Sequence, residues 1–135
     1  MEQRIATCGC GGLQVVCSGD PVRISMRHCL ACQRRTGARF GVQSWFQRDQ
    51  VCITGTSTAY TRTAASGNNV AFQSCPTCGS TVYWELSGFP DLIAVALGMF
   101  ADPGYPAPMI SVWERTRHPW TEHVADLAMQ HSDVG

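Results

Sequence analysis

The residues best suited to do chemistry are eight cysteines, six of which stand in short-spaced pairs. Cys8-Gly-Cys10 lies near the N-terminus, and Cys75-Pro-Thr-Cys78 lies past the middle of the chain. A tetrahedral ion bound by four thiolates needs neighbouring sulfurs less than about 4 Å apart, and tight turns bring paired cysteines that close. These two pairs therefore predict one closed structural zinc site, and the alternative is a pair of reduced dithiols or a disulfide.

The third pair, Cys29-Leu-Ala-Cys32, supplies only two sulfurs. A catalytic zinc has three protein ligands and an open position for water or substrate, and it holds a bound thiol as the thiolate. We therefore predict that Cys29 and Cys32 are catalytic residues, ligands of a second zinc ion, or both. Arg27, two residues before the pair, cannot be the third ligand because a guanidinium has no free lone pair.

Other side chains could complete the second site. His28 is adjacent, although neighbouring side chains on a strand point to opposite faces. Cys17 and Cys52 lie in apolar strand patterns, where cysteine behaves as a small hydrophobic residue, so we expect both in the core. Three outcomes stay open: another group replaces the missing ligand, metal binds only together with a substrate thiol, or the site holds no metal.

Short segments rich in β-branched and aromatic residues must position these cysteines. Turn residues separate them, which predicts antiparallel sheets rather than βαβ units. The expected strands span 13–17, 22–26, 40–46, 50–54, 58–62, 70–74, 81–85, 93–97 and 110–113. We also expect a short helix after Cys29 and another near 124–129. The predicted organisation is one mainly β domain over 1–129 and a short tail over 130–135.

Composition excludes several classes of protein. The 135 residues carry ten basic and ten acidic side chains, and this balance argues against nucleic-acid binding. A membrane span is not expected, since no run of 18 apolar residues occurs. The N-terminus shows no export signal, so we expect a cytoplasmic protein, in which short-spaced cysteines are metal ligands or reactive thiols.

Four motifs occur in order along nearly the whole chain: Cys8-Gly-Cys10-Gly11, Cys29-x-x-Cys32-Gln-Arg34-Arg35-Thr36-Gly37, Cys75-Pro-Thr-Cys78-Gly79-Ser80 and Pro119-Trp120. Together they resemble the glutathione-dependent formaldehyde-activating enzyme family, also called the centromere protein V family. The resemblance implies a β-tent fold of packed antiparallel sheets and a structural zinc on the four cysteines of the first and third motifs.

The same resemblance implies a second zinc on three cysteines that meets the thiol of glutathione. The reaction joins this thiol to formaldehyde, which is carbon–sulfur lyase chemistry run in either direction. Arg34, Arg35, Thr36 and Gly37 follow the pair as candidate substrate-binding residues, because arginine can hold carboxylates through two hydrogen bonds. The alternative is that the arginines bind no substrate and form a solvated face of a helix.

This chain departs from the family pattern at one position, since Arg27 stands where the first cysteine of the trio is expected. The departure leaves two main hypotheses. One is a zinc-dependent enzyme of carbon–sulfur chemistry on a glutathione-like thiol adduct. The other is a non-catalytic β domain held together by zinc, which serves as a binding or scaffold protein. A thiol redox protein that uses Cys29 and Cys32 is a third possibility, although the missing βαβ pattern argues against a thioredoxin-like version.

Overall fold

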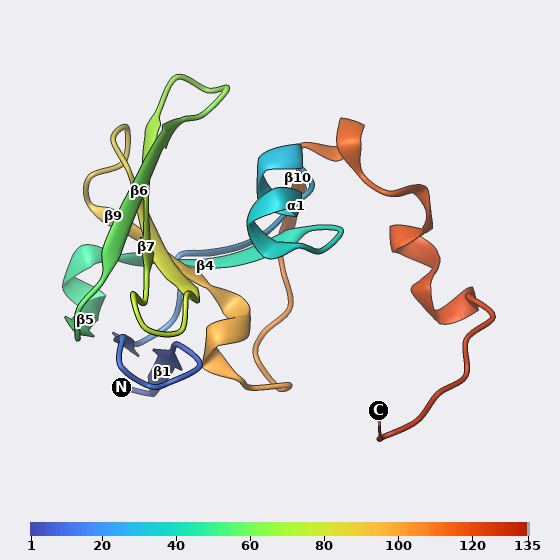
Figure 1. Ribbon diagram of the computed structural model, residues 1–135, viewed down its shortest axis with the longest axis horizontal. Coiled ribbons are helices and arrows are strands. Elements are labelled where there is room, and N and C mark those ends of the chain that lie inside the picture. The colour runs from blue at the N-terminus through green and yellow to red at the C-terminus, as the bar shows by residue number, and fades with distance from the viewer. Residues whose placement is uncertain (135) are drawn as a thin grey trace.

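The computed structural model describes residues 1–134 and is mainly β, as predicted (Figure 1). Strands β1, β2 and β5 form a three-stranded sheet, and the other seven form a sheet of order β10-β3-β4-β9-β8-β7-β6. The strands are β1 (Gln3–Thr7), β2 (Gln14–Ser18), β3 (Arg23–Arg27), β4 (Gly41–Gln47), β5 (Val51–Thr54), β6 (Thr58–Thr63), β7 (Asn69–Ser74), β8 (Thr81–Leu86), β9 (Leu92–Ala96) and β10 (Ile110–Val112).

The nine expected strands all correspond to observed ones, with two differences. β1 was not expected, because its segment combines polar residues with few apolar ones; it forms by pairing antiparallel with β2. The other difference is β10, which pairs parallel with β3 although only antiparallel pairs were expected. The chain leaves the sheet after β9, passes through η2 (Leu97–Phe100) and a loop, and returns to the edge of the sheet beside β3.

The core lies on both faces of the large sheet. On one face, Val15 and Cys17 of β2 pack with Phe46 of β4 and Val82 of β8, which places this cluster between the two sheets. On the other face, Trp45 joins a second cluster with Phe72 and Trp84. Successive residues on a strand face opposite sides, so β4 contributes to both clusters.

The two cysteines outside the pairs behave differently. Cys17 is fully buried, as the apolar pattern predicts. Cys52 is exposed, so the expectation that it lies in the core is wrong. β5 is an edge strand in which every second residue faces solvent, and Cys52 occupies one of these outward positions.

The short helix expected after Cys29 is α1 (Leu30–Thr36), and Gly37 ends it in the left-handed conformation with φ 66°. The other short helices are 3-10 turns: η1 (Arg48–Gln50), η2 (Leu97–Phe100), η3 (Glu114–Thr116) and η4 (Pro119–Asp126). η4 overlaps the helix expected near 124–129 only in part. Residues 130–134 carry no helix or strand, and residue 135 lies outside the described part of the chain.

Within residues 1–134, no helix combines the length and the apolar character needed to cross a membrane. The chain after β10 instead continues as η3 and η4, which extend away from the sheets (Figure 1).

Gly55 holds the β5–β6 turn against the loop that follows the first cysteine pair. Its φ is +100°, and a Cβ there would lie 1.9 Å from the carbonyl oxygen of Gly12. We expect Gly55→Ala to lower the free energy of unfolding by about 3 kcal/mol or more, because backbone strain and a backbone clash add.

Gly67→Ala is the matched control for this change. Gly67 has a similar φ of +91°, but a Cβ there would meet no atom within 4 Å, so we expect a loss of only about 1 kcal/mol. Urea denaturation of both variants measures the difference. Equal losses would show that the close approach of Gly12 does not matter.

Candidate functional site

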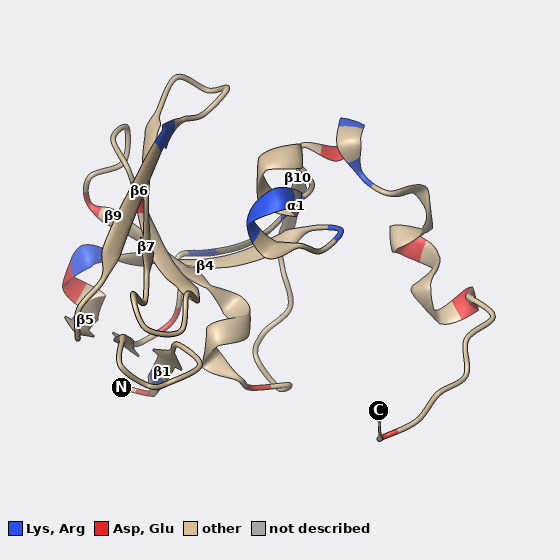
Figure 2. Ribbon diagram, viewed as in Figure 1, with Lys and Arg blue, Asp and Glu red and all other residues tan. Residues whose placement is uncertain are grey.

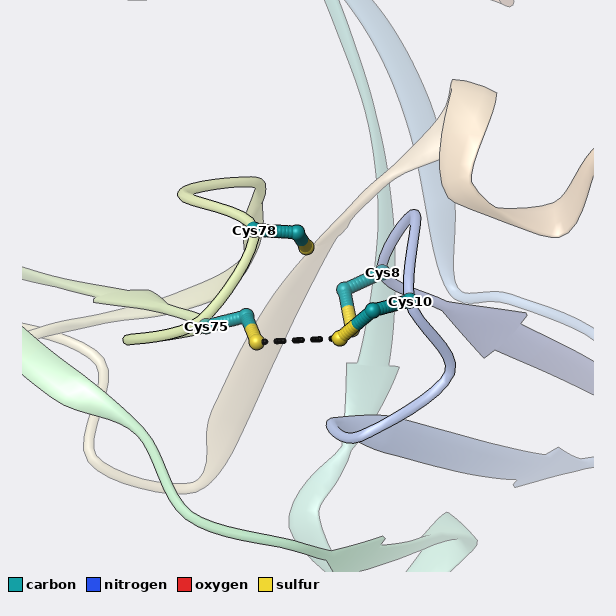
Figure 3. A group of neighbouring side chains, drawn as sticks. All are labelled: Cys8, Cys10, Cys75 and Cys78. Carbon is teal, nitrogen blue, oxygen red and sulfur yellow. Dashed lines mark hydrogen bonds between the residues drawn. The ribbon is translucent and has the colours of Figure 1, made fainter.

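Two tight turns bring four thiols together in what we call the four-cysteine cluster, Cys8, Cys10, Cys75 and Cys78 (Figure 3). The first pair lies in the loop between β1 and β2, and the second lies in the turn between β7 and β8. The Sγ atoms of Cys8 and Cys10 are 3.6 Å apart, those of Cys10 and Cys75 are 3.5 Å apart, and all four lie within 4.8 Å of one another. Four thiolates on a tetrahedral ion lie about 3.8 Å apart, so the cluster could hold a metal ion.

Neighbouring groups favour the thiolate at Cys8 and Cys78, whereas hydrogen bonds with Cys75 and Cys8 raise the pKa of Cys10 to about 11. The backbone N–H of Leu13 donates to Cys8 Sγ at 3.2 Å. Hydrogen bonds from the side chain and backbone of Ser80 lower the pKa of Cys78 to about 5. Such donors around ligand sulfurs are typical of metal sites, where they orient the ligands and stabilise their charge.

The Cys29/Cys32 pair lies apart from this cluster, at the start of α1. Cys29 is the N-cap residue, and its Sγ accepts the backbone N–H of Cys32 at 3.4 Å. The two Sγ atoms are only 2.7 Å apart. Cys29 is partly exposed, whereas Cys32 is buried behind it.

The pKa values of the two thiols are shifted in opposite directions. The hydrogen bond from Cys32, the backbone N–H of that residue and the positive charges of Arg27 and Arg62 together lower the pKa of Cys29 to about 5. The same hydrogen bond and burial raise the pKa of Cys32 far above its usual range. At neutral pH, Cys29 is therefore a thiolate and Cys32 a thiol.

Among the described residues, the Cys29/Cys32 pair lacks the third protein ligand that a catalytic zinc ion needs. Among residues 1–134, the four-cysteine cluster is the one place where three or more His, Cys, Asp or Glu ligand atoms come together. His28 is buried; its Nε2 shares a hydrogen bond of 2.9 Å with the hydroxyl of Ser111, and its Nδ1 has no hydrogen-bond partner among the described residues. The sulfurs of Cys29 and Cys32 are also about 1 Å too close for two thiolates on one tetrahedral ion.

Cys29 instead lines a basic hollow that we call the arginine cleft. It has a volume of about 490 Å³, and Arg27, Arg62 and Arg115 line it together with Trp113. A second hollow of about 470 Å³ shares Arg62 with it and adds further arginines. No Asp or Glu lines either hollow, so their combined charge favours an anionic ligand.

Over the described residues, most arginines lie apart from the carboxylates. All ten basic residues are arginines, and three of them lie within 4.0 Å of a carboxylate oxygen: Arg4, Arg48 and Arg117. Within the described residues the others have no such partner, and all of them line hollows around α1 and β3: Arg23, Arg27, Arg34, Arg35, Arg39, Arg62 and Arg115. Figure 2 shows this basic colour on α1, on the loop after it and on β6. The cleft is therefore basic although the chain carries no net charge.

Arg27 stands at the sequence position where the family resemblance places the first cysteine of the trio. It ends β3, two residues before Cys29, and lines the arginine cleft. Its Nε is buried, and among the described residues it has no hydrogen-bond partner. An unpartnered buried donor beside a thiolate is a ready contact for a bound anion.

The four predicted substrate-binding residues lie at the end of α1. Arg34 is exposed and lines the second hollow together with Arg35. The guanidinium of Arg35 also lies over the ring of Trp84 at 4.3 Å, so part of its role is to cover the core. Thr36 donates from Oγ1 to the carbonyl of Cys32 at 2.9 Å, and Gly37 caps the helix, so both have a structural role in ending α1.

Sequence reasoning missed Arg62 and Arg115 as cleft residues. They come from β6 and η3, and only the folded topology brings them to Cys29. No local motif marks either residue, so only a map of contacts between distant parts of the chain could have found them.

Comparisons with known proteins agree with the motifs. A crystal structure of a Rhodobacter sphaeroides protein, a Northeast Structural Genomics target, superposes with a TM-score of 0.57, covering 79% of this chain and 98% of that one. The two sequences are 15% identical, so this likeness concerns the fold alone. No curated protein matches the chain. The family model of the glutathione-dependent formaldehyde-activating enzyme matches residues 3–116, and the chain therefore belongs to this family.

Proposed function

We propose that the protein binds a structural zinc in the four-cysteine cluster and performs carbon–sulfur bond chemistry on an anionic thiol in the arginine cleft. The thiol is of the glutathione class, and the carbon partner is an aldehyde such as formaldehyde. The observation that carries the proposal is the position of Cys29, a thiolate at the edge of a cleft lined by three arginines and no acidic residue.

The zinc proposal rests on the donor set and its spacing. The four cysteine sulfurs lie within 4.8 Å of one another, and two of their separations are 3.5 and 3.6 Å, which matches the preference of zinc for thiolates in a tetrahedron. Such a site has no open position, so the ion would stabilise the fold and take no part in turnover.

The reaction needs a place for a thiolate, and the cleft offers one. When the adduct of a thiol and an aldehyde is cleaved, its hydroxyl loses a proton to solvent, the carbonyl re-forms, and the carbon–sulfur bond breaks. The departing sulfur carries the negative charge, which the guanidiniums of Arg27, Arg62 and Arg115 stabilise. The same charges lower the pKa of the bound thiol when the reaction runs toward the adduct.

Cys29 can carry the aldehyde carbon between binding events. Its thiolate adds to the carbonyl carbon, the π electrons move to oxygen, and the oxygen takes a proton from water. Collapse of this hemithioacetal returns the aldehyde next to the bound thiolate, which captures it. These steps use residues of the chain and no second metal ion.

A non-catalytic binding module is the alternative function. Arg27 in place of a ligand favours it, since the chain lacks the third thiolate that the family resemblance implies. In that case the arginine cleft would bind the same anionic thiol without turnover.

Exchange spectroscopy by NMR tests the proposal on the zinc-loaded protein with glutathione and formaldehyde. We expect the protein to accelerate exchange between free glutathione and its hydroxymethyl adduct, and Cys29→Ser to lose this acceleration. Arg62→Met should raise the KM for glutathione about tenfold, because a charge-assisted contact is lost.

Arg48→Met is the matched control, because Arg48 pairs with Glu85 at 3.0 Å and lines neither the arginine cleft nor the second hollow. It should leave exchange unchanged. Saturable glutathione binding without accelerated exchange would support the binding module. Absence of both would contradict the assignment of the cleft.

A further inference from the structure

The Cys29/Cys32 pair has a feature that carbon–sulfur chemistry does not require. A second thiol, Cys32, lies 2.7 Å from the reactive sulfur and is buried behind it. An aldehyde carrier needs one sulfur only. Two free thiols at this separation, one accessible and one shielded, are the arrangement of a dithiol that forms and breaks a disulfide.

The surroundings fix the order in which the two sulfurs would react. Cys29 lines the arginine cleft beside Arg27 and Arg62, and its Sγ accepts the backbone N–H of Cys32 at 3.4 Å. Cys32 is 7% exposed and does not line the cleft. An incoming disulfide can therefore meet Cys29 and cannot meet Cys32.

We propose that the Cys29/Cys32 pair exchanges with the disulfide of a small anionic thiol, of which glutathione disulfide is the probe. This activity goes beyond the proposed carbon–sulfur chemistry and uses the same cleft. The positive charge of the lining residues and the combined size of the two hollows indicate this class of ligand.

The cleft suits a ligand longer and more anionic than one thiol. The arginine cleft and the second hollow, of about 490 and 470 Å³, share Ala31 and Arg62 along their lining. Between them they present Arg27, Arg115, Arg34 and Arg35, and no carboxylate of the described residues lines them. A disulfide of two anionic thiols carries twice the negative charge of one and would extend from Cys29 into the second hollow.

The exchange balances in two steps. The Cys29 thiolate attacks one sulfur of the disulfide, so a Cys29–ligand disulfide forms and one thiolate leaves. That thiolate takes the proton of Cys32, and the Cys32 sulfur attacks Cys29 to form the protein disulfide and release the second thiolate. The net reaction is one dithiol and one disulfide giving one protein disulfide and two small thiols. Excess small thiol drives the reverse reaction.

The experiment treats zinc-loaded full-length protein with excess glutathione disulfide, without aldehyde, and maps the products by peptide mass spectrometry. We expect a Cys29–Cys32 disulfide and the release of two glutathiones per chain. In Cys32→Ala the second step is blocked, so a stable mixed disulfide should accumulate at Cys29. The exposed Cys52 is the internal control and should react at least about tenfold more slowly.

A neutral disulfide, bis(2-hydroxyethyl) disulfide, separates recognition by the cleft from general thiol reactivity. Arg62→Met should slow reaction of Cys29 with glutathione disulfide about tenfold and leave the neutral disulfide unaffected. Equal reaction of Cys29 and Cys52, or no mixed disulfide in Cys32→Ala, would overturn the proposal. The adduct exchange assay contains no disulfide, so carbon–sulfur chemistry can persist when this activity fails, and the reverse also holds.

Discussion

Replacement of Cys75 by serine is expected to remove the bound zinc and to unfold most of the protein at room temperature. Cys75 and Cys8 are each 3% exposed and belong to the core cluster between the two sheets, so their ion would join those sheets. Structural zinc contributes about 10–16 kcal/mol in small zinc domains, which matches or exceeds the whole stability of an ordinary domain. Elemental analysis and thermal unfolding followed by circular dichroism measure both effects.

Cys52→Ser is the matched control for this prediction, because Cys52 is an exposed cysteine outside the four-cysteine cluster. It should keep one zinc per chain and the wild-type melting curve. Treating the wild type with a strong chelator should reproduce the loss seen in Cys75→Ser. If the variant melts like the wild type, the four sulfurs are reduced thiols and carry no structural ion.

Period-two patterning made most of the fold predictable. Strands such as β4 and β8 carry β-branched and aromatic residues between turn residues, and this pattern depends only on local sequence. β1 was missed because its order comes from pairing with β2 and not from its own composition. The parallel pairing of β10 depends on the path of the chain after β9, which no local pattern contains.

For the candidate site too, local features could be predicted and contacts between distant segments could not. Spacing of one or two residues within a turn is local, so the cysteine pairs and the merging of two pairs into one cluster could be predicted. Arg62 and Arg115 line the same cleft as Cys29 but come from distant parts of the chain, and no sequence motif indicates them. The roles of Arg34, Arg35, Thr36 and Gly37 in substrate binding stay predictions, although the helix end explains the last two structurally.

We propose that Arg27 and a second zinc ion would compete for the Cys29 thiolate. A zinc dication and a guanidinium both neutralise the Cys29 thiolate, but at close range they repel. The positive charge of Arg27 helps to lower the pKa of Cys29, and the Cys32 sulfur lies 2.7 Å from the Cys29 sulfur. With three thiolates and an ion, the sulfurs would have to separate to about 3.8 Å. We therefore expect the residue at position 27 to decide between a metal site and a dithiol.

Arg27→Cys is therefore expected to raise the zinc content from one to two ions per chain. The change creates Cys-x-Cys-x-x-Cys, supplies the third thiolate and removes a positive charge beside Cys29. Elemental analysis of purified protein, with and without glutathione, measures the gain. Glutathione should strengthen binding of the second ion, because its thiolate can fill the open fourth position.

Arg27→Ser separates the two causes, because it removes the charge without adding a ligand. We expect this variant to keep one zinc per chain, since two thiolates and no third protein ligand hold the ion weakly. A second readout is the mixed disulfide at Cys29, which should be lost in Arg27→Cys once the metal holds the thiolates, and retained in Arg27→Ser. A zinc content of one in both variants would show that more than Arg27 prevents the second site. A content of two in both would show that charge alone had excluded the ion.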